Sequence, residues 1–410
     1  MIDKYDIAIV GGGSAGIMAA ISASQIGNTV ALIEKNPQVG RKLLATGNGR
    51  CNLTNRHLSI DCYHGAKPEF TAAVLNQFDQ HETMAFFQDL GLLLKEEDAG
   101  RIFPRTNQAS SVVEVLRLKL IENGVHTMVD SQVRAIEKKA DWKITLADGR
   151  KLKADRLILA TGGRAAHTFG STGDGLYWAE KLGHTITPIY PALVPMETVE
   201  QWPNEAQGIK VEARVSATSD GMCIQELEGD VLFTSYGVSG PAVMGLARSI
   251  APLMNESHVQ LHIDLFPEMS REVLYGLVSH AFQHSAIKTS RDALIGILPS
   301  GLIPVVLQLA HLNATTPAGD VSKSKLSQVV DTLKSLTLTV AGLRRLKEAQ
   351  VTAGGVVTDE IDPRSLESRL VKGLFFAGEI MDVDGDSGGF NLQWAWSSGY
   401  VAGLSLQIEF

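Results

Sequence analysis

The stretch YDIAIVGGGSAGIMAAISASQIGNTVALIE, residues 5–34, decides the fold that the sequence predicts. Its first six residues have the pattern of a short buried strand, and the glycine-rich GGGSAG follows at once. IMAAISASQIG then favours a helix, and TVALIE a second strand that ends in Glu34. A strand, a glycine turn, a helix and a strand in so short a segment are typical of a βαβ unit in a doubly wound α/β sheet.

The glycines of this turn have the spacing of a nucleotide-binding site. Gly11 permits the tight turn, Gly13 lets the backbone approach a pyrophosphate, and Gly16 lets helix and strand pack closely. The N-terminus of the helix that follows these glycines offers unpaired amides and a partial positive charge to phosphate groups. Glu34 can accept hydrogen bonds from a ribose diol and would repel a 2′-phosphate. We therefore expect a dinucleotide here.

Two further strand ends carry glycines that expose the backbone. The strand in ADRLILATGG ends at residues 160–163, and KGLFFAGE ends at 378–379, where a glycine-rich turn leads into a helix near Asn391. Parallel strands bring such ends to one edge of a sheet, where open α/β sheets bind ligands. A ligand touched by both chain ends is long, which favours FAD. Its pyrophosphate would lie at the first helix, and its flavin pyrimidine at the amides of the last.

The segment GRKLLATGNGRCNLTN, residues 40–55, has neither the period of a helix nor the alternation of a strand. Because it follows the ribose-binding strand, we expect it to run beside the pyrophosphate towards the flavin. Arg41 and Lys42 can neutralise phosphate charge, and residues 47–49 can let the backbone lie against a flat ring. Asn48 and Asn52 can supply hydrogen bonds to flavin edges or to a substrate carbonyl.

The composition is that of an ordinary globular protein. Of 410 residues, 44% are hydrophobic and 20% charged, and the length allows two or three domains. The net charge of −8 argues weakly against a general polyanion binder. Cys51, Cys62 and Cys223 form no CxxC pair, which fits a reducing, cytoplasmic location. The apolar run at 7–10 is too short for a signal peptide, and residues 293–312, broken by prolines, favour a packed helical hairpin over a membrane span.

Longer motifs resemble a known family. GGGSAG, GRKLLATGNGRCNLTN, GRIFPRTNQASSVV, GSTGDGLYWAEKLGH, PALVPM, SGPAVM and EIDPRSLESRLVKGLFFAGEIMDVDGDSGGFNLQWAWSSG are together similar to the BaiN/RdsA-like NAD(P)/FAD-dependent oxidoreductases. The resemblance covers nearly the whole chain and is weakest between residues 250 and 340. It implies a glutathione-reductase-like, Rossmann-like FAD-binding domain (1–193 and 351–410), an inserted β-rich domain (194–268 and 336–350) and a small helical domain (269–335).

The middle of the chain agrees with this plan. KVEARVSA, MCIQELEGDVLFTS and HVQLHIDL alternate as strands do, and we expect a turn near Gly229-Asp230 inside the second. From residue 270 to 335 the pattern becomes helical.

The expected FAD site draws on both ends of the chain, and NAD(P)H is the expected transient reductant. Since no second GxGxxG is present, a nicotinamide cofactor would lack a Rossmann domain of its own. The residues expected to contact FAD are Gly11, Gly13, Ser14, Ala15, Gly16, Glu34, Lys35, Arg41, Lys42, Gly47, Asn48, Gly49, Val133, Ala160, Thr161, Gly162, Gly378, Glu379, Gly389, Asn391, Leu392 and Gln393.

Three residues are candidates for catalysis. Cys51 could give a proton to a substrate carbon while a hydride arrives from the flavin, or it could pack as a small buried side chain. Arg105 could bind an anionic or carbonyl-bearing substrate, or form surface ion pairs, and Asn48 could bind a substrate carbonyl. The histidines are scattered without ligand spacing, so we expect no metal.

The family resemblance implies three substrate classes: steroid-like or bile-acid enones, uridine in ribosomal RNA, and a small amine such as aminoacetone. The first two share one reaction, the reduction of a carbonyl-conjugated carbon–carbon double bond, which we expect here, with a slight preference for RNA. A basic stripe of Arg164, Lys210, Arg214, Arg248 and residues 323–325 would help to bind RNA. A structural protein that only holds FAD is the non-enzyme alternative. We expect no membrane partner, and the sequence leaves the oligomeric state open.

Overall fold

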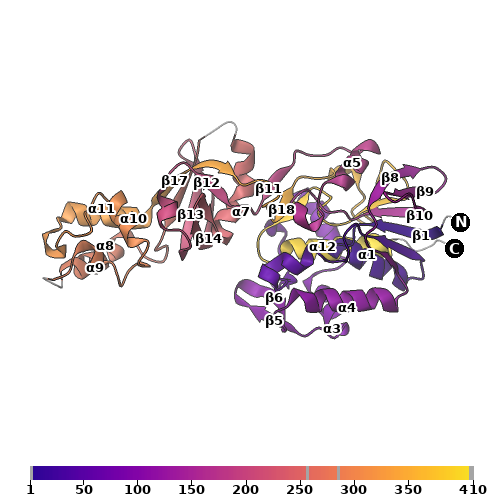
Figure 1. Ribbon diagram of the computed structural model, residues 1–410, viewed down its shortest axis with the longest axis horizontal. Helices are drawn as coiled ribbons and strands as arrows, with labels where there is room; N and C mark the ends of the chain where they lie inside the picture. Colours follow the sequence, from indigo (N-terminus) through magenta and orange to yellow (C-terminus); the bar gives the residue numbers. More distant parts are fainter. Residues whose placement is uncertain (1–2, 255–257, 284–286, 406–410) are drawn as a thin grey trace. The chain divides into compact units, whose positions relative to one another are not determined.

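The computed structural model describes residues 3–254, 258–283 and 287–405, which form parts of two compact units (Figure 1). Unit 1 consists of Met1–Tyr190 and Gln350–Phe410, and unit 2 of Pro191–Ala349. The chain leaves unit 1 through β11 (Tyr190–Ala192) and returns through β18 (Val351–Ala353). Segments from both ends of the sequence therefore share unit 1. A separate helical domain within unit 2 stays a prediction.

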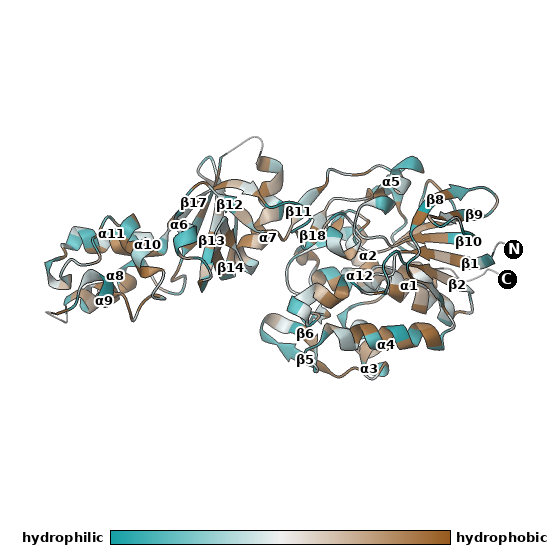
Figure 2. Ribbon diagram, viewed as in Figure 1, coloured by the Kyte–Doolittle hydropathy of each residue, from teal (hydrophilic) through white to brown (hydrophobic). Residues whose placement is uncertain are grey.

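A largely parallel sheet forms the centre of unit 1. Its strands are β1 (Asp3–Val10), β2 (Val30–Ile33), β7 (His126–Met128), β8 (Val133–Lys138), β9 (Trp142–Leu146), β10 (Lys151–Leu159) and β19 (Leu374–Phe376). The order β7-β2-β1-β10-β19 is parallel, and the β8–β9 hairpin pairs antiparallel with the first half of β10. All of β2 and the last half of β1 are buried without alternation, as in a sheet covered on both faces. These strands are strongly hydrophobic (Figure 2).

The described helices of unit 1 include α1 (Ser14–Gln25), α2 (Pro68–Leu75), α3 (Gln80–Asp89), α4 (Ala109–Glu122), α5 (Asp174–Lys181) and α12 (Phe390–Leu404). Two of them, α1 and α12, pack against each other through glycines. A Cβ at Gly399 of α12 would lie 2.4 Å from the Ala15 carbonyl oxygen of α1, and one at Gly403 2.6 Å from that of Ala19. Only glycine allows so close an approach of two backbones. Because 399 and 403 meet 15 and 19 in order, α1 and α12 run in the same direction.

Short elements surround the edge of the sheet. One of them is the 3-10 turn η1 (Leu43–Gly49). Three strands, β3 (Thr54–Asn55), β5 (Leu94–Glu97) and β6 (Arg101–Pro104), form a small antiparallel sheet, and β4 (Tyr63–Gly65) pairs with β20 (Val383–Gly385). The described helices include none with the length and apolar character that a membrane crossing requires.

Unit 2 contains a closed antiparallel barrel. Its strands are β12 (Met196–Thr198), β13 (Lys210–Ser219), β14 (Met222–Thr234), β15 (Gly237–Ser239), β16 (Val259–Asp264) and β17 (Leu336–Leu343). They close in the order β12-β15-β14-β13-β16-β17. Ala213, Val215 and Ala217 alternate with more exposed neighbours and are fully buried, so the barrel interior is a packed core. Further helices of unit 2 are α6 (Trp202–Glu205), α7 (Pro241–Ile250), α8 (Arg271–Gln283), α9 (Ser290–Ala293), α10 (Ile303–Leu309) and α11 (Lys323–Lys334).

The turn predicted near Gly229-Asp230 is wrong. Strand β14 continues through both residues, and Gly229 pairs with Ala213 of β13. The hairpin turns instead at Asp220-Gly221, where both residues have positive φ (50° and 79°). Asp-Gly with this backbone is the two-residue turn that matches the twist of antiparallel strands.

Candidate functional site

The glycine turn has the close contacts that its spacing predicts. A Cβ at Gly16 would lie 1.9 Å from the Gly11 carbonyl oxygen, and a Cβ at Gly11, whose φ is +107°, would lie 2.4 Å from the Ala160 carbonyl oxygen. A Cβ at Gly13 would meet no atom within 4 Å. Gly11 and Gly16 therefore bring β1, α1 and β10 together, whereas Gly13 borders open space.

The N-terminus of α1 opens onto this space. Gly13 is its N-cap and supplies no side-chain hydrogen bond. The amide of Ile17 donates to the Gly13 carbonyl oxygen (2.9 Å), and in the described chain the amides of residues 14–16 make no comparable bond. Unpaired amides together with the helix dipole form an anion-binding site.

Glu34 folds back onto the glycine turn. Its side chain is buried, Oε2 accepts from the Gly12 amide (2.7 Å), and Oε1 accepts from the amide and the side chain of Asn36 (2.8 and 2.7 Å). A carboxylate has about four acceptor positions, so one remains for a ribose hydroxyl. Val133 begins β8 close by, because the Ser131 amide donates to the Glu34 carbonyl oxygen (2.9 Å).

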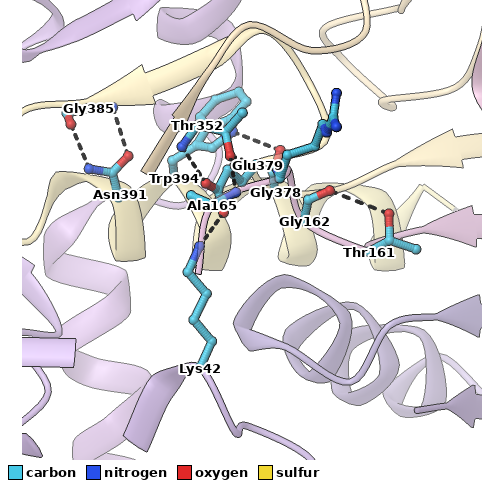
Figure 3. Close-up of polar contacts among 11 residues, drawn as sticks. Lys42, Thr161, Gly162, Ala165, Thr352, Gly378, Glu379, Gly385, Asn391 and Trp394 are labelled. Atoms are coloured by element: carbon cyan, nitrogen blue, oxygen red, sulfur yellow. Dashed lines mark hydrogen bonds and ion pairs between the residues drawn. The ribbon is translucent and has the colours of Figure 1, made fainter. Parts of the chain in front are cut away.

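The three basic residues after β2 take different places. Lys35 forms an ion pair with Asp174 (2.9 Å), and Arg41 is exposed. Lys42 Nζ reaches Glu379 Oε2 at 2.7 Å, and both side chains are partly buried (Figure 3). Lys42 is thus the residue of this group that the structure joins to the C-terminal strand end.

Thr352 ties two strand ends together. Its hydroxyl oxygen accepts from the amides of Arg164 and Ala165 (both 2.8 Å), and its own amide donates to Glu379 Oε1 (2.7 Å) (Figure 3). Gly162 has φ +72°, and a Cβ there would lie 3.8 Å from Glu379 Oε2. The residues after β10 and after β19 therefore meet at one edge of the sheet.

Close packing fixes the same strand ends against helices. The Gly378 carbonyl oxygen accepts from Trp394 Nε1 (3.2 Å), and a Cβ at Gly378 would lie 2.8 Å from the Ala15 Cβ. On the other side, a Cβ at Gly175 would lie 1.9 Å from Thr161 Oγ1. Substitution at Gly378 would push α1 away from this strand end, and substitution at Gly175 would push α5 away from Thr161.

Helix α12 presents its N-terminus at this edge. Its N-cap Gly389 has φ +108°, and the amide of Gln393 donates to the Gly389 carbonyl oxygen (3.0 Å). In the described chain the amides of residues 390–392 have no comparable partner. The side chain of Asn391 bonds the amide and carbonyl of Gly385 (2.8 and 2.6 Å), which shapes the preceding turn (Figure 3).

Gln393 does not face the site, and its predicted contact with FAD is corrected. Its side chain is fully buried. Nε2 donates to Thr83 Oγ1 (2.8 Å) and Ser397 Oγ (2.9 Å), and Oε1 accepts from Thr54 Oγ1 (2.5 Å). Because its amide is also used inside α12, neither its backbone nor its side chain is free for a ligand.

The two helix N-termini are offset along a common direction. Gly399 of α12 contacts Ala15 of α1. Ala15 is the second residue of α1, whereas Gly399 is the tenth residue of α12, so the N-terminus of α12 lies eight residues further from this contact. At 1.5 Å per residue the offset is about 12 Å. One anion-binding terminus therefore lies beside the glycine turn, and a second lies further along the same edge. This arrangement fits a long nucleotide that carries a pyrophosphate at one point and an electron-rich ring at another.

The loop that contains η1 has a left-handed backbone at three successive residues. Gly47, Asn48 and Gly49 all have positive φ (56°, 56° and 81°), and a Cβ at Gly47 would lie 2.9 Å from the Asn52 amide nitrogen. Asn48 is exposed, whereas the Asn52 side-chain oxygen is buried without a partner. The loop therefore offers backbone and amide groups where a ring would be expected.

Sequence reasoning missed Arg50, which anchors this loop. Its guanidinium donates to Glu97 Oε1 (2.5 Å) and Asn107 Oδ1 (2.8 Å) and lies 4.1 Å from the centre of the Phe103 ring. Hydrogen bonds from Arg50 and Lys95 lower the pKa of Glu97 to about 2. The partners lie far along the chain, so no local pattern could have indicated them.

The catalytic candidates differ in their exposure to solvent. Cys51 is fully buried, and burial raises the pKa of its thiol to about 12. This supports packing, and its role as a proton donor stays a prediction. Arg105 is exposed just after β6. Among the described residues, no group of three or more His, Cys, Asp or Glu side chains is arranged to hold a metal ion.

A family model described as the HI0933-like protein Rossmann domain matches residues 5–405. The chain belongs to this family. The resemblance inferred from the motifs and the predicted α/β fold class are thereby confirmed.

Individual relatives extend over the full chain. A 3-dehydro-bile acid delta(4,6)-reductase of Clostridium scindens is 39% identical and aligns over 97% of this chain and 98% of its own. A ribosomal RNA dihydrouridine synthase of Escherichia coli is 30% identical over 99% and 98%. The fold is also that of 3-ketosteroid delta1-dehydrogenase from Sterolibacterium denitrificans, with a TM-score of 0.55, 14% identity and full coverage of both chains.

Proposed function

We propose that this HI0933-like chain reduces a carbon–carbon double bond conjugated to a carbonyl, with FAD bound along the sheet edge and NAD(P)H as electron donor. The observation that carries the proposal is the pair of offset, unpaired helix N-termini at α1 and α12. The names of the full-length relatives support it, since saturating a bile-acid enone and forming dihydrouridine are the same reaction type.

Each part of the site has a proposed role. Bound FAD would supply hydride from N5 to the alkene carbon β to the carbonyl. The amides at the start of α1 hold the pyrophosphate, and Lys42 offsets the charge of Glu379 beside it. The N-terminus of α12 would favour negative charge at the pyrimidine end of the flavin. Asn48 and Arg105 remain candidates for the donor to the substrate carbonyl.

A small enone is the substrate class that we favour. The bile-acid reductase shares more sequence identity with this chain than the RNA enzyme does. Two members of the expected basic stripe are also neutralised: Lys210 pairs with Asp230 (3.0 Å), and Arg214 with Glu228 (2.5 Å) and Glu226 (3.4 Å). Uridine in ribosomal RNA is the second candidate, which the 30% identical relative supports.

Anaerobic stopped-flow spectroscopy tests the proposal. We expect NADH or NADPH to bleach the flavin absorbance of the purified protein in a first mixing step. A conjugated steroid enone added in a second mixing step should then restore the absorbance. An unmodified ribosomal RNA fragment serves as the competing acceptor, and a saturated ketone as the control. Reoxidation by RNA alone would reverse our preference between substrates. Reoxidation by oxygen but by neither acceptor would refute double-bond reduction.

A further inference from the structure

Arg101, at the start of β6, carries a positive charge that no described acidic side chain pairs with. Its side chain is partly exposed, and Nε donates to the Asp98 carbonyl oxygen (3.0 Å). Among the described residues its guanidinium makes no other hydrogen bond and no ion pair. The carboxylate opposite it on β5, that of Glu97, is already bound by Arg50 (2.5 Å) and Lys95 (2.9 Å). Four of the five N–H groups of Arg101 are therefore left for another acceptor.

A short series of contacts connects this guanidinium to the N-terminus of α12. Asp98, which Arg101 contacts, precedes Ala99 in the turn between β5 and β6. The Asn55 side-chain nitrogen donates to the carbonyl oxygens of both Ala99 (3.1 Å) and Gly388 (3.0 Å). Gly388 lies two residues before the first residue of α12. The unused N–H groups of Arg101 are therefore close to the helix terminus at which we place the flavin ring.

The sheet face that carries Arg101 also borders the η1 loop. Alternate residues of a strand project from the same face, so Phe103 shares the face of Arg101. Asn55 is paired with Arg101 across β3 and β6 and projects from that face as well. The Phe103 ring packs against the η1 loop, because a Cβ at Gly47 would lie 3.2 Å from its Cε1 atom. Arg101 is thus next to two side chains that contact the two segments bordering the expected ring.

Reduction of a conjugated double bond creates negative charge on the carbonyl oxygen. In the proposed reaction a hydride adds to the carbon β to the carbonyl, and the displaced electron pair moves onto the oxygen to give an enolate. A proton from water then adds to the α-carbon and restores the C=O bond. A cation with several N–H donors stabilises the enolate oxygen more than the neutral carbonyl.

We propose that the guanidinium of Arg101 donates hydrogen bonds to the carbonyl oxygen of the substrate and stabilises the enolate. This inference rests on the proposed function, because it needs a carbonyl-conjugated substrate beside the flavin.

Double-mixing stopped flow on the FAD-loaded protein tests the two half-reactions separately. NADH or NADPH first bleaches the flavin, and a conjugated steroid enone then restores its absorbance. Arg101→Met should be bleached at the wild-type rate and reoxidised about 10²–10³-fold more slowly, which is the usual loss when one oxyanion donor is removed. Arg101→Lys keeps the charge without the planar fork of donors, so its loss should be smaller.

Arg56→Met is the matched control. Arg56 is an exposed arginine next to β3 that pairs with Glu96 (3.2 Å), so its loss should leave both rates unchanged. A further readout needs no turnover: in calorimetric titrations, Arg101→Met should bind the saturated ketone product about 10-fold more weakly than wild type, because a charge-assisted hydrogen bond is lost. Methylguanidinium in solution should partly restore the reoxidation of Arg101→Ala.

The outcomes separate this inference from the function on which it rests. Reoxidation of Arg101→Met at the wild-type rate would overturn the role of Arg101 and leave the proposed function in place. Equal slowing of bleaching and reoxidation would show a structural role and would overturn it as well. Slow reoxidation of Arg105→Met alone would make Arg105 the donor instead. If the enone does not reoxidise the wild-type protein, the inference and the proposed function fail together.

Discussion

Replacing Gly13 by alanine should abolish FAD binding and leave the fold intact. Gly13 has φ −79° and ψ −173°, which alanine adopts without strain, and its added Cβ would meet no protein atom within 4 Å. Alanine is a poorer N-cap than glycine, but it also lowers the entropy of the unfolded chain, so the net change should stay below about 1 kcal/mol. The added methyl group would instead occupy the space where the pyrophosphate must approach the α1 amides.

Gly16→Ala is the matched contrast. Its Cβ would lie 1.9 Å from the Gly11 carbonyl oxygen, so backbone must move by more than an ångström. Overpacking of this kind costs about 1–3 kcal/mol or more. Gly16→Ala should therefore unfold at a lower temperature whether or not FAD is present.

Thermal unfolding with and without FAD distinguishes the two. At free FAD about 100-fold above its Kd, binding stabilises the native protein by about 2.7 kcal/mol, which raises Tm by about 5–10 °C for a unit of this size. We expect that rise in the wild-type protein and none in Gly13→Ala, whose FAD-free Tm should match wild type. An undiminished FAD-dependent rise in Gly13→Ala would refute the placement of the pyrophosphate at the α1 terminus.

Two further predictions concern ionisable groups. Because the Cys51 thiol has a pKa of about 12, iodoacetamide at pH 8 should alkylate exposed Cys223 and spare Cys51, as mass spectrometry of the native protein would show. The Cys51→Ala variant should keep both bound FAD and turnover. A large loss of turnover with FAD retained would instead make Cys51 the proton donor. Arg50 and Lys95 lower the pKa of Glu97 to about 2 from 4.5, so its contribution to stability is present above pH 4.5 and is lost as the pH falls to about 2. The difference in urea midpoint between wild type and Glu97→Gln should therefore shrink across that interval, and a constant difference would contradict the ion pair.

Predictions that depended on local pattern were the most successful ones. The first strand, the glycine turn and the helix are found as β1 (Asp3–Val10) and α1 (Ser14–Gln25), because backbone geometry and burial there follow from neighbouring residues. The turn predicted at Gly229-Asp230 was wrong for a related reason. Gly-Asp is a local turn signal, but pairing with β13 satisfies that backbone in an extended form, and Asp220-Gly221 makes the turn.

Predictions that depended on which side of an element meets the core were less secure. Gln393 was expected to contact FAD because it lies in the first turns of the last helix. The structure directs its side chain to Thr83, Ser397 and Thr54 in the core. The phase of a helix relative to its neighbours is set by packing, and α12 carries apolar residues on all sides, so its sequence does not show which face turns inwards.

By itself, the sequence determined the dinucleotide fold, the family and the approximate set of segments that gather at the sheet edge, since each follows from short motifs whose residues are neighbours in the chain. Only the tertiary structure decided the pairing of Lys42 with Glu379, the anchoring of the loop by Arg50 through Glu97, the 12 Å offset of the α1 and α12 termini (about eight residues of helix) and the unpaired oxygen of Asn52. These depend on contacts between residues tens to hundreds of positions apart, whose distances are set by how the helices and strands pack.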